Sequence, residues 1–186
     1  MVEIAEVQRG HRWRIIGWGA AVAILAAPFV AMQLNAEGVN WTVGDFLAMG
    51  IMLGAVGGFL ELAVRMTRNR YYRTGAGLAL LGAFLLAWAN LAVGIVGSEN
   101  NPNNQLFFVA LLIGIAGIIG AKARAEGMVR AMLTTAGSIV AAFVFAELSA
   151  RDEPIVRPVV EAVGTSIFVV LFLGSAWMFG RAAADS

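Results

Sequence analysis

Six runs of apolar residues constrain the fold of this chain more than any other feature of its sequence. A transmembrane helix needs about 20 predominantly apolar residues, because it rises 1.5 Å per residue through about 30 Å of hydrocarbon. The six runs are Ile15–Leu34, Gly44–Val64, Thr74–Gly97, Leu106–Ala121, Met128–Leu148 and Arg157–Gly180. The sequence therefore predicts an all-α polytopic membrane protein folded as a bundle of six transmembrane helices.

The composition excludes several classes of protein. Of the 186 residues, 60% are hydrophobic and only 13% are charged, whereas soluble domains average about 45–50% and about 25%. The absence of cysteine and the single histidine, His11, leave no disulfide, thiolate metal site or multi-histidine metal site. A net charge of +1 gives no basic field for nucleic acid. We expect no metal and no cofactor, and the lipid bilayer is the partner that this composition requires.

The basic residues are divided unevenly between the two sides of the predicted bundle. Most of the 13 fall on the side that carries both termini: Arg9, Arg12, Arg14, Arg65, Arg68, Arg70, Arg73, Lys122, Arg124, Arg130 and Arg181. The opposite loops hold only Arg151 and Arg157. Because positive residues are retained in the cytoplasm, both termini are expected there. Residues 1–14 and 182–186 then form cytoplasmic segments that flank a membrane domain of residues 15–181.

The kind of basic residue also bears on the source of the protein. All of the basic residues except Lys122 are arginines, and alanine and glycine are abundant. This bias is typical of GC-rich bacterial genomes. The expected location is therefore the bacterial inner membrane.

Small residues recur at helical spacing and predict where the helices approach each other. In the second run they form two overlapping GxxxG steps, at Gly50, Gly54 and Gly58. One face of the third run carries Ala76, Ala79, Ala83, Ala87, Asn90, Gly94 and Gly97, and the fourth run repeats glycine at Gly114, Gly117 and Gly120. Such residues let membrane helices pack closely. We expect the second and third helices to pack together, although the seam of a homo-oligomer would use the same residues.

Two polar residues interrupt the second and third runs. Glu61 precedes Arg65 by four residues, a spacing that favours an ion pair along one helix face. A cation- or proton-binding role for Glu61 is the alternative, because carboxylates inside membranes are often functional. Asn90 is expected to join two helices by hydrogen bonding or, alternatively, to line a polar cavity.

Three acidic residues lie near the outer ends of predicted helices: Asp45, Glu147 and Glu161. They would form an outward-facing acidic vestibule if they converge, with Arg151 and Arg157 as counter-charges, and would favour cations or protons there. The alternative is that each reaches interfacial water separately. Thr42 and Asp45 also have the spacing of a helix capping box.

Three stretches resemble a group of uncharacterised small six-helix bacterial inner-membrane proteins. They are Asn40-Trp41-Thr42-x-x-Asp45-Phe46, Glu61-Leu62-Ala63-Val64-Arg65, and Leu91-Ala92-Val93-Gly94-Ile95-x-Gly97-Ser98-Glu99-x-Asn101-Pro102. The resemblance extends over about residues 14–181. It implies a six-helix inner-membrane protein and brings no activity, substrate or cofactor with it.

No catalytic constellation is visible in the sequence. His11 and Lys122 lie on cytoplasmic flanks, away from the intramembrane serines that a nucleophilic dyad would need. Glu147 with Glu161 is the one pair that could support a carboxylate enzyme. The leading hypothesis is a non-enzymatic membrane protein that acts by interaction, as an accessory subunit, a scaffold or a binder of a lipophilic ligand, with a membrane-protein partner or a second copy.

The alternative function is a small transporter or channel for a cation, proton or small solute. It would use Glu61, Asn90 and the outer acidic residues. Such a protein requires a continuous polar path between the two sides of the bundle.

Overall fold

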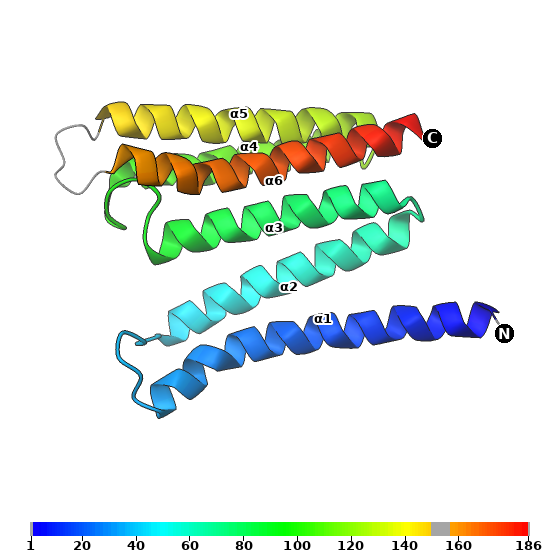
Figure 1. The fold of residues 1–186 in the computed structure, drawn as a ribbon, viewed down its shortest axis with the longest axis horizontal. Coiled ribbons are helices and arrows are strands. Elements are labelled where there is room, and N and C mark those ends of the chain that lie inside the picture. Colours follow the sequence, from blue (N-terminus) through cyan, green and yellow to red (C-terminus); the bar gives the residue numbers. More distant parts are fainter. Residues whose placement is uncertain (1, 150–156, 186) are drawn as a thin grey trace. The chain divides into compact units, whose positions relative to one another are not determined.

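The computed structural model describes residues 2–149 and 157–185, with side chains from Arg14 onward. Its helices are α1 (Val2–Gln33), α2 (Val43–Met66), α3 (Arg70–Ala92), α4 (Gln105–Ala121), α5 (Ala125–Ser149) and α6 (Pro158–Ala184), with a short 3₁₀ helix, η1 (Pro102–Asn104), before α4 (Figure 1). All six α-helices are long and apolar enough to span a membrane, and no strand occurs among the described residues. The all-α, six-helix prediction is confirmed.

The predicted start of the first membrane span agrees with the structure, whereas the predicted end of the third helix does not. α1 begins at Val2, but its candidate membrane span is Arg14–Gln33, which begins one residue before the predicted Ile15. The third helix ends at Ala92 rather than Gly97. Gly94 and Gly97 have φ angles of +75° and +68°, values that glycine adopts without steric cost. The prediction that Gly94 lies on a helical packing face is therefore wrong.

The chain divides into two compact units, and the boundary falls inside α2, between Phe59 and Leu60. Unit 1 is Met1–Phe59 and unit 2 is Leu60–Ser186. In unit 1, the ring of Trp18 lies against Gly57, where an added Cβ would come within 3.0 Å of it. Gly57 therefore provides the close approach of α2 to α1.

The predicted glycine stripe of α2 lies elsewhere on the helix. Among the described side chains of α1, from Arg14 onward, one lies near the Cβ position of this stripe: Leu25, at 3.9 Å from the Cβ position of Gly50. Packing of this stripe against the third helix stays a prediction.

Unit 2 is built around α3, α4, α5 and α6. α6 packs against both α3 and α5, and α4 packs against α5 (Figure 1). Two glycines of α3 outside the predicted face of small residues contact α6: Gly75 lies against Met178 and Phe179, and Gly82 lies against Leu171 and Phe172. Glycine allows this contact, since a Cβ at either position would lie 3.2–3.3 Å from these side chains.

Other small residues predicted for packing have different surroundings. Ala83 and Ala87 are half-buried on α3. On α4, Gly114 lies against Thr135 and Gly117 lies against Ala131, so this pair of glycines sets the approach of α4 to α5. No heavy atom lies within 4 Å of a Cβ built at Gly120.

Candidate functional site

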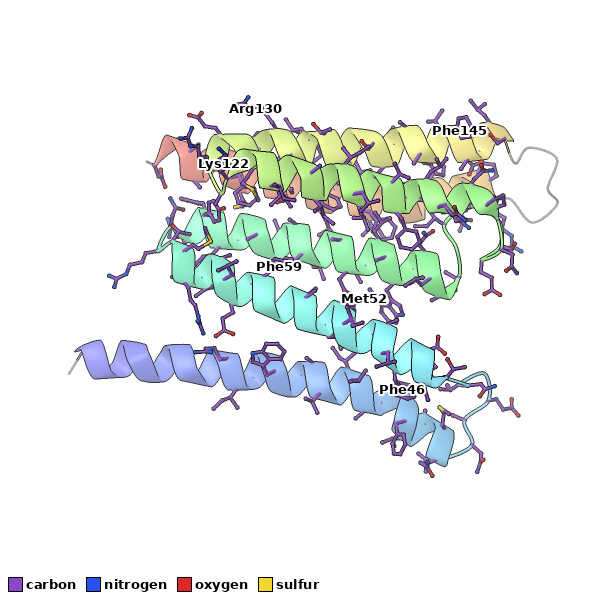
Figure 2. All side chains as sticks on the ribbon, turned by 180° about the vertical axis from the view of Figure 1, so that it is seen from behind. Phe46, Met52, Phe59, Lys122, Arg130 and Phe145 are labelled. Carbon is purple, nitrogen blue, oxygen red and sulfur yellow. The ribbon has the colours of Figure 1, made fainter. Side chains whose placement is uncertain are left out.

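The up-and-down order of the helices gives unit 2 two chemically different ends. The cationic end contains the α2–α3 turn, the α4–α5 turn and the C-terminal end of α6, with Arg65, Arg68, Arg70, Arg73, Lys122, Arg124, Arg130 and Arg181. The acidic end contains the α3–α4 loop, the last turn of α5 and the first turns of α6, with Glu99, Glu147 and Glu161. Figure 2 labels Lys122 and Arg130 at the cationic end and Phe145 near the acidic end.

At the cationic end, polar side chains pair with each other and with helix termini. The structure contains the expected ion pair, with 2.9 Å between Arg65 Nη2 and Glu61 Oε1. Arg73 donates to Thr67 O and Val64 O, both at 2.8 Å, which satisfies carbonyls at the C-terminal end of α2. Hydrogen bonds within the chain therefore hold the α2–α3 turn.

The start of α3 is capped in the same way. Asn69 Oδ1 accepts hydrogen bonds from Tyr71 N and Tyr72 N, at 2.9 and 3.2 Å. This is the ordinary role of asparagine at a helix N-cap. A cavity of about 210 Å³ adjoins the turn and is lined by Met66, Thr67, Asn69, Tyr72, Ala123, Ala125 and Ala182.

Asn104 organises the loop at the acidic end. Its Oδ1 accepts hydrogen bonds from Ile95 N and Val96 N, both at 3.0 Å, and its Nδ2 donates to Ser98 O at 2.8 Å. Only 4% of Asn104 is exposed. One side-chain amide thus replaces the backbone partners that a helix would have supplied. Asn104 is not among the residues that the sequence pattern singles out.

Asn90 connects the end of α3 to the start of α4. Its Nδ2 donates to Asn104 O at 2.9 Å, which agrees with the expected role in joining helices. Its Oδ1 is buried and has no hydrogen-bond partner. Glu61 precedes α3 and Asn90 lies near its end, so these two predicted residues are at opposite ends of unit 2.

Glu161 ties the first turn of α6 to the α3–α4 loop. Its Oε1 accepts hydrogen bonds from Gly97 N at 3.0 Å and from Arg157 N at 3.1 Å. The carboxyl of Glu147 lies beside that of Glu161. The structure therefore brings together two of the three outer acidic residues that the sequence singled out.

The third acidic residue, Asp45, belongs to unit 1 and serves a local cap. Its Oδ2 accepts hydrogen bonds from Thr42 N at 2.7 Å and from Thr42 Oγ1 at 2.8 Å, and Asp45 N donates to Thr42 Oγ1 at 3.3 Å. This is the expected capping box. The predicted counter-charge Arg151 lies outside the described residues.

Buried side-chain atoms without a hydrogen-bond partner gather at the acidic end. Within the described ranges they are Asn90 Oδ1, Asn101 Nδ2, Glu147 Oε1, Glu161 Oε2 and Thr165 Oγ1. Buried polar atoms are nearly always hydrogen-bonded, so a concentration of exceptions needs an explanation. The sequence analysis did not single out Thr165. Its position four residues after Glu161, on the same face of α6, is the signal that could have found it.

The helix register places these groups at one level of the bundle. Val129 of α5 lies next to Gly180 of α6. Because the two helices are antiparallel, each step forward along α5 corresponds to one step backward along α6. Glu147 of α5 is therefore level with Ala162 of α6, the residue after Glu161. The register of α3 on α6, taken from Gly82 and its neighbours Leu171 and Phe172, sets Asn90 opposite Val163 and Gly164.

The core between the two ends is filled mainly by apolar side chains. Leu86, Met132 and Ile139 fill it, each 1% exposed or less. Apart from the acidic end, the buried polar residues in the described ranges are Thr135 and Ser175, which donate to Ala131 O at 2.8 Å and Gly75 O at 2.7 Å. No group of three or more acidic, histidine or cysteine side chains is close enough to hold a metal in the part of the chain that the structure describes.

Comparison with known proteins identifies no relative of this chain. No family model matches the sequence, and no curated protein or solved structure matches the chain. The site must therefore be interpreted from its own geometry.

Proposed function

We propose that this chain is a non-enzymatic integral membrane protein of the bacterial inner membrane that acts by interaction, as an accessory subunit or scaffold. The observation that carries the proposal is the apolar core of unit 2. Conduction through this unit would need a polar path from one end to the other, whereas Leu86, Met132 and Ile139 close the middle. The cavity at the cationic end, about 210 Å³, is smaller than the roughly 300–1,000 Å³ typical of ligand pockets, which favours a scaffold over a binder of lipophilic molecules.

The surface of unit 2 offers apolar helix faces for lateral contacts. Leu112, Ile115 and Ile119 of α4 are 52–71% exposed. Such faces contact lipid or another transmembrane helix, and close packing of partner helices is the usual basis of association in a bilayer. A second copy of the chain or a different membrane protein would both fit this role.

The orientation proposed for the bundle has both termini in the cytoplasm. The clustering of eight described basic residues at the cationic end of unit 2, from Arg65 to Arg181, supports it, because arginine and lysine near helix ends are retained on the cytoplasmic side. Reporter fusions at each terminus test the orientation. Two cytoplasmic signals are expected, and a signal from opposite sides would contradict an even number of spans.

Native mass spectrometry of the protein released directly from membrane vesicles tests the interaction. We expect a complex heavier than one 19.6 kDa chain, containing a second copy or another membrane protein. A single chain carrying only lipid would contradict the proposal. Cross-linking inside intact membranes before release keeps weak complexes from dissociating and makes a negative result decisive.

A small cation or proton transporter is the second candidate. The unpartnered polar atoms at the acidic end favour it. Reconstitution of the purified protein into sealed vesicles separates the two candidates. The scaffold proposal predicts proton and sodium leakage equal to that of protein-free vesicles. A protein-dependent flux that is lost in Glu147→Gln and kept in Glu99→Gln would contradict the scaffold proposal and support a transporter.

A further inference from the structure

We propose that the acidic end of unit 2 holds one divalent cation of the calcium type, bound by the carboxylates of Glu147 and Glu161 together with Asn90 Oδ1 and Thr165 Oγ1. The proposal is independent of the proposed function, because a bound ion can hold helix ends together in a scaffold or in any other membrane protein.

The first argument is charge. The Glu147 carboxyl lies beside that of Glu161, and two adjacent carboxylates repel each other unless a positive charge or a shared proton compensates them. The Glu161 Oε1 atom receives two backbone hydrogen bonds, but Glu161 Oε2 and Glu147 Oε1 are buried and receive none. Across residues 14–149 and 157–185, no arginine or lysine forms an ion pair with either carboxylate.

The second argument is independent of the acidic residues and comes from two neutral oxygens. Thr165 and Asn90 are only 4% and 6% exposed, and neither Thr165 Oγ1 nor Asn90 Oδ1 has a hydrogen-bond partner. The Cα–Cβ bonds of a helix lean toward its N-terminus, so the side chain of Thr165 leans toward the turn that carries Glu161. The hydrogen bond from Asn90 Nδ2 to Asn104 O holds the Asn90 amide at this same end of the bundle.

The donor set determines the class of ion. All four ligands are oxygens, which favours a hard cation over zinc, copper or iron. Two carboxylates balance the charge of a divalent ion. Calcium accepts six to eight oxygens in irregular arrangements and completes its shell with water, whereas magnesium demands nearly octahedral geometry.

Binding would join three helices. Asn90 comes from α3, Glu147 from α5 and Glu161 with Thr165 from α6. Glu161 also holds Gly97 of the α3–α4 loop, so the ion would stabilise that loop indirectly. The expected effect is therefore a cation-dependent rise in the stability of the whole unit.

The test uses the full-length protein, stripped with a chelator, in lipid nanodiscs made only of phosphatidylcholine. We expect calcium chloride at 100 times its dissociation constant to raise the unfolding temperature by about 5–10 °C, with a smaller rise for magnesium and none for sodium at equal ionic strength. Glu147→Gln and Glu161→Gln should abolish the rise, and Thr165→Val should reduce it. Glu99→Gln is the matched control, because Glu99 is exposed at the same end, and it should keep the full rise.

A direct binding measurement guards against variants that fail to fold. Terbium is a luminescent substitute for calcium, and excitation of tryptophan should sensitise it in the wild-type protein, with one ion bound per chain and displacement by calcium. Absence of both stoichiometric terbium binding and a calcium-dependent rise would overturn the proposal. So would a rise that survives in Glu147→Gln and Glu161→Gln, which would indicate binding to lipid headgroups. An unfolding temperature that does not change with added cations but rises on acidification would also contradict the proposal. It would indicate that the two carboxyls share a proton instead of binding an ion.

Discussion

Both ends of unit 2 must supply hydrogen-bond partners for polar groups at the ends of helices, and the two ends carry side chains of opposite charge. At the cationic end the side chains are mainly donors, and helix C-termini supply carbonyls that need donors, so Arg73 bonds directly to Val64 O and Thr67 O. At the acidic end the carboxylates are acceptors. Gly97 N and Arg157 N both donate to one oxygen of Glu161, and Glu161 Oε2 and Glu147 Oε1 are buried without a hydrogen-bond partner. The acidic end therefore keeps buried oxygens without a partner, whereas Arg73 at the cationic end bonds directly to the backbone.

The largest effect is expected where the acidic end depends on one glycine. Gly94→Ala places a side chain at a φ of +75° and puts its Cβ 2.6 Å from Asn104 Nδ2. We expect a loss of about 3–4 kcal/mol in the free energy of unfolding, from backbone strain and steric overlap together. Thermal or denaturant unfolding in micelles measures it. Gly164→Ala on α6 is the control, because no heavy atom lies within 4 Å of its Cβ position. Equal stability of the two variants would show that the loop is not held as described.

A smaller effect on the free energy of unfolding is expected when the same asparagine-to-aspartate substitution is made at each end. Asn104→Asp replaces the Nδ2 donor with a carboxylate oxygen that faces Ser98 O, and the repulsion should cost about 2–3 kcal/mol of unfolding free energy. Asn69→Asp makes the same change at the cationic end, where only the Oδ1 acceptor is used, and should be neutral or slightly stabilising because aspartate is a good N-cap. Unfolding measurements on the two variants side by side test the contrast, and a similar cost at both positions would remove it.

The smallest effect is expected at the cationic end. Arg65→Gln removes the ion pair with Glu61, and the Arg65 side chain is 66% exposed. Pairs of this spacing contribute about 0.3–0.5 kcal/mol and are screened by salt. We expect a loss of that size at low ionic strength and none in 1 M sodium chloride. A loss well above 1 kcal/mol that persists in salt would mean that Arg65 has a role beyond this pair.

The sequence was sufficient for the six helices because long apolar runs identify transmembrane helices almost regardless of tertiary structure. It placed the end of the third helix too late, because Val93, Ile95 and Val96 continue the apolar run. The break there depends on Gly94 and on hydrogen bonds to Asn104, which lies several residues further along the chain. A hydropathy pattern contains no information about such contacts.

The candidate site was only partly accessible to the same reasoning. Glu147 and Glu161 were singled out because both lie near the outer ends of predicted helices, where converging acidic residues would favour cations or protons. Thr165 and Asn104 were missed, because a threonine or asparagine becomes informative only when its hydrogen-bond partners are known. The packing of Gly75 and Gly82 on α6 was also missed, because the stripes of small residues in the second and third runs directed attention to a contact between those two helices.

The asparagine-centred loop also determines how thick a bilayer this chain can tolerate. With 17 residues, α4 reaches only about 25 Å at 1.5 Å per residue, short of an average hydrocarbon layer of about 30 Å. Irregular backbone survives at hydrocarbon depth only if protein groups replace water as its partners. Asn90 and Asn104 provide those partners. The loop before α4 would therefore be tolerated within the hydrocarbon layer, and the bilayer would not need to become thinner beside this short helix.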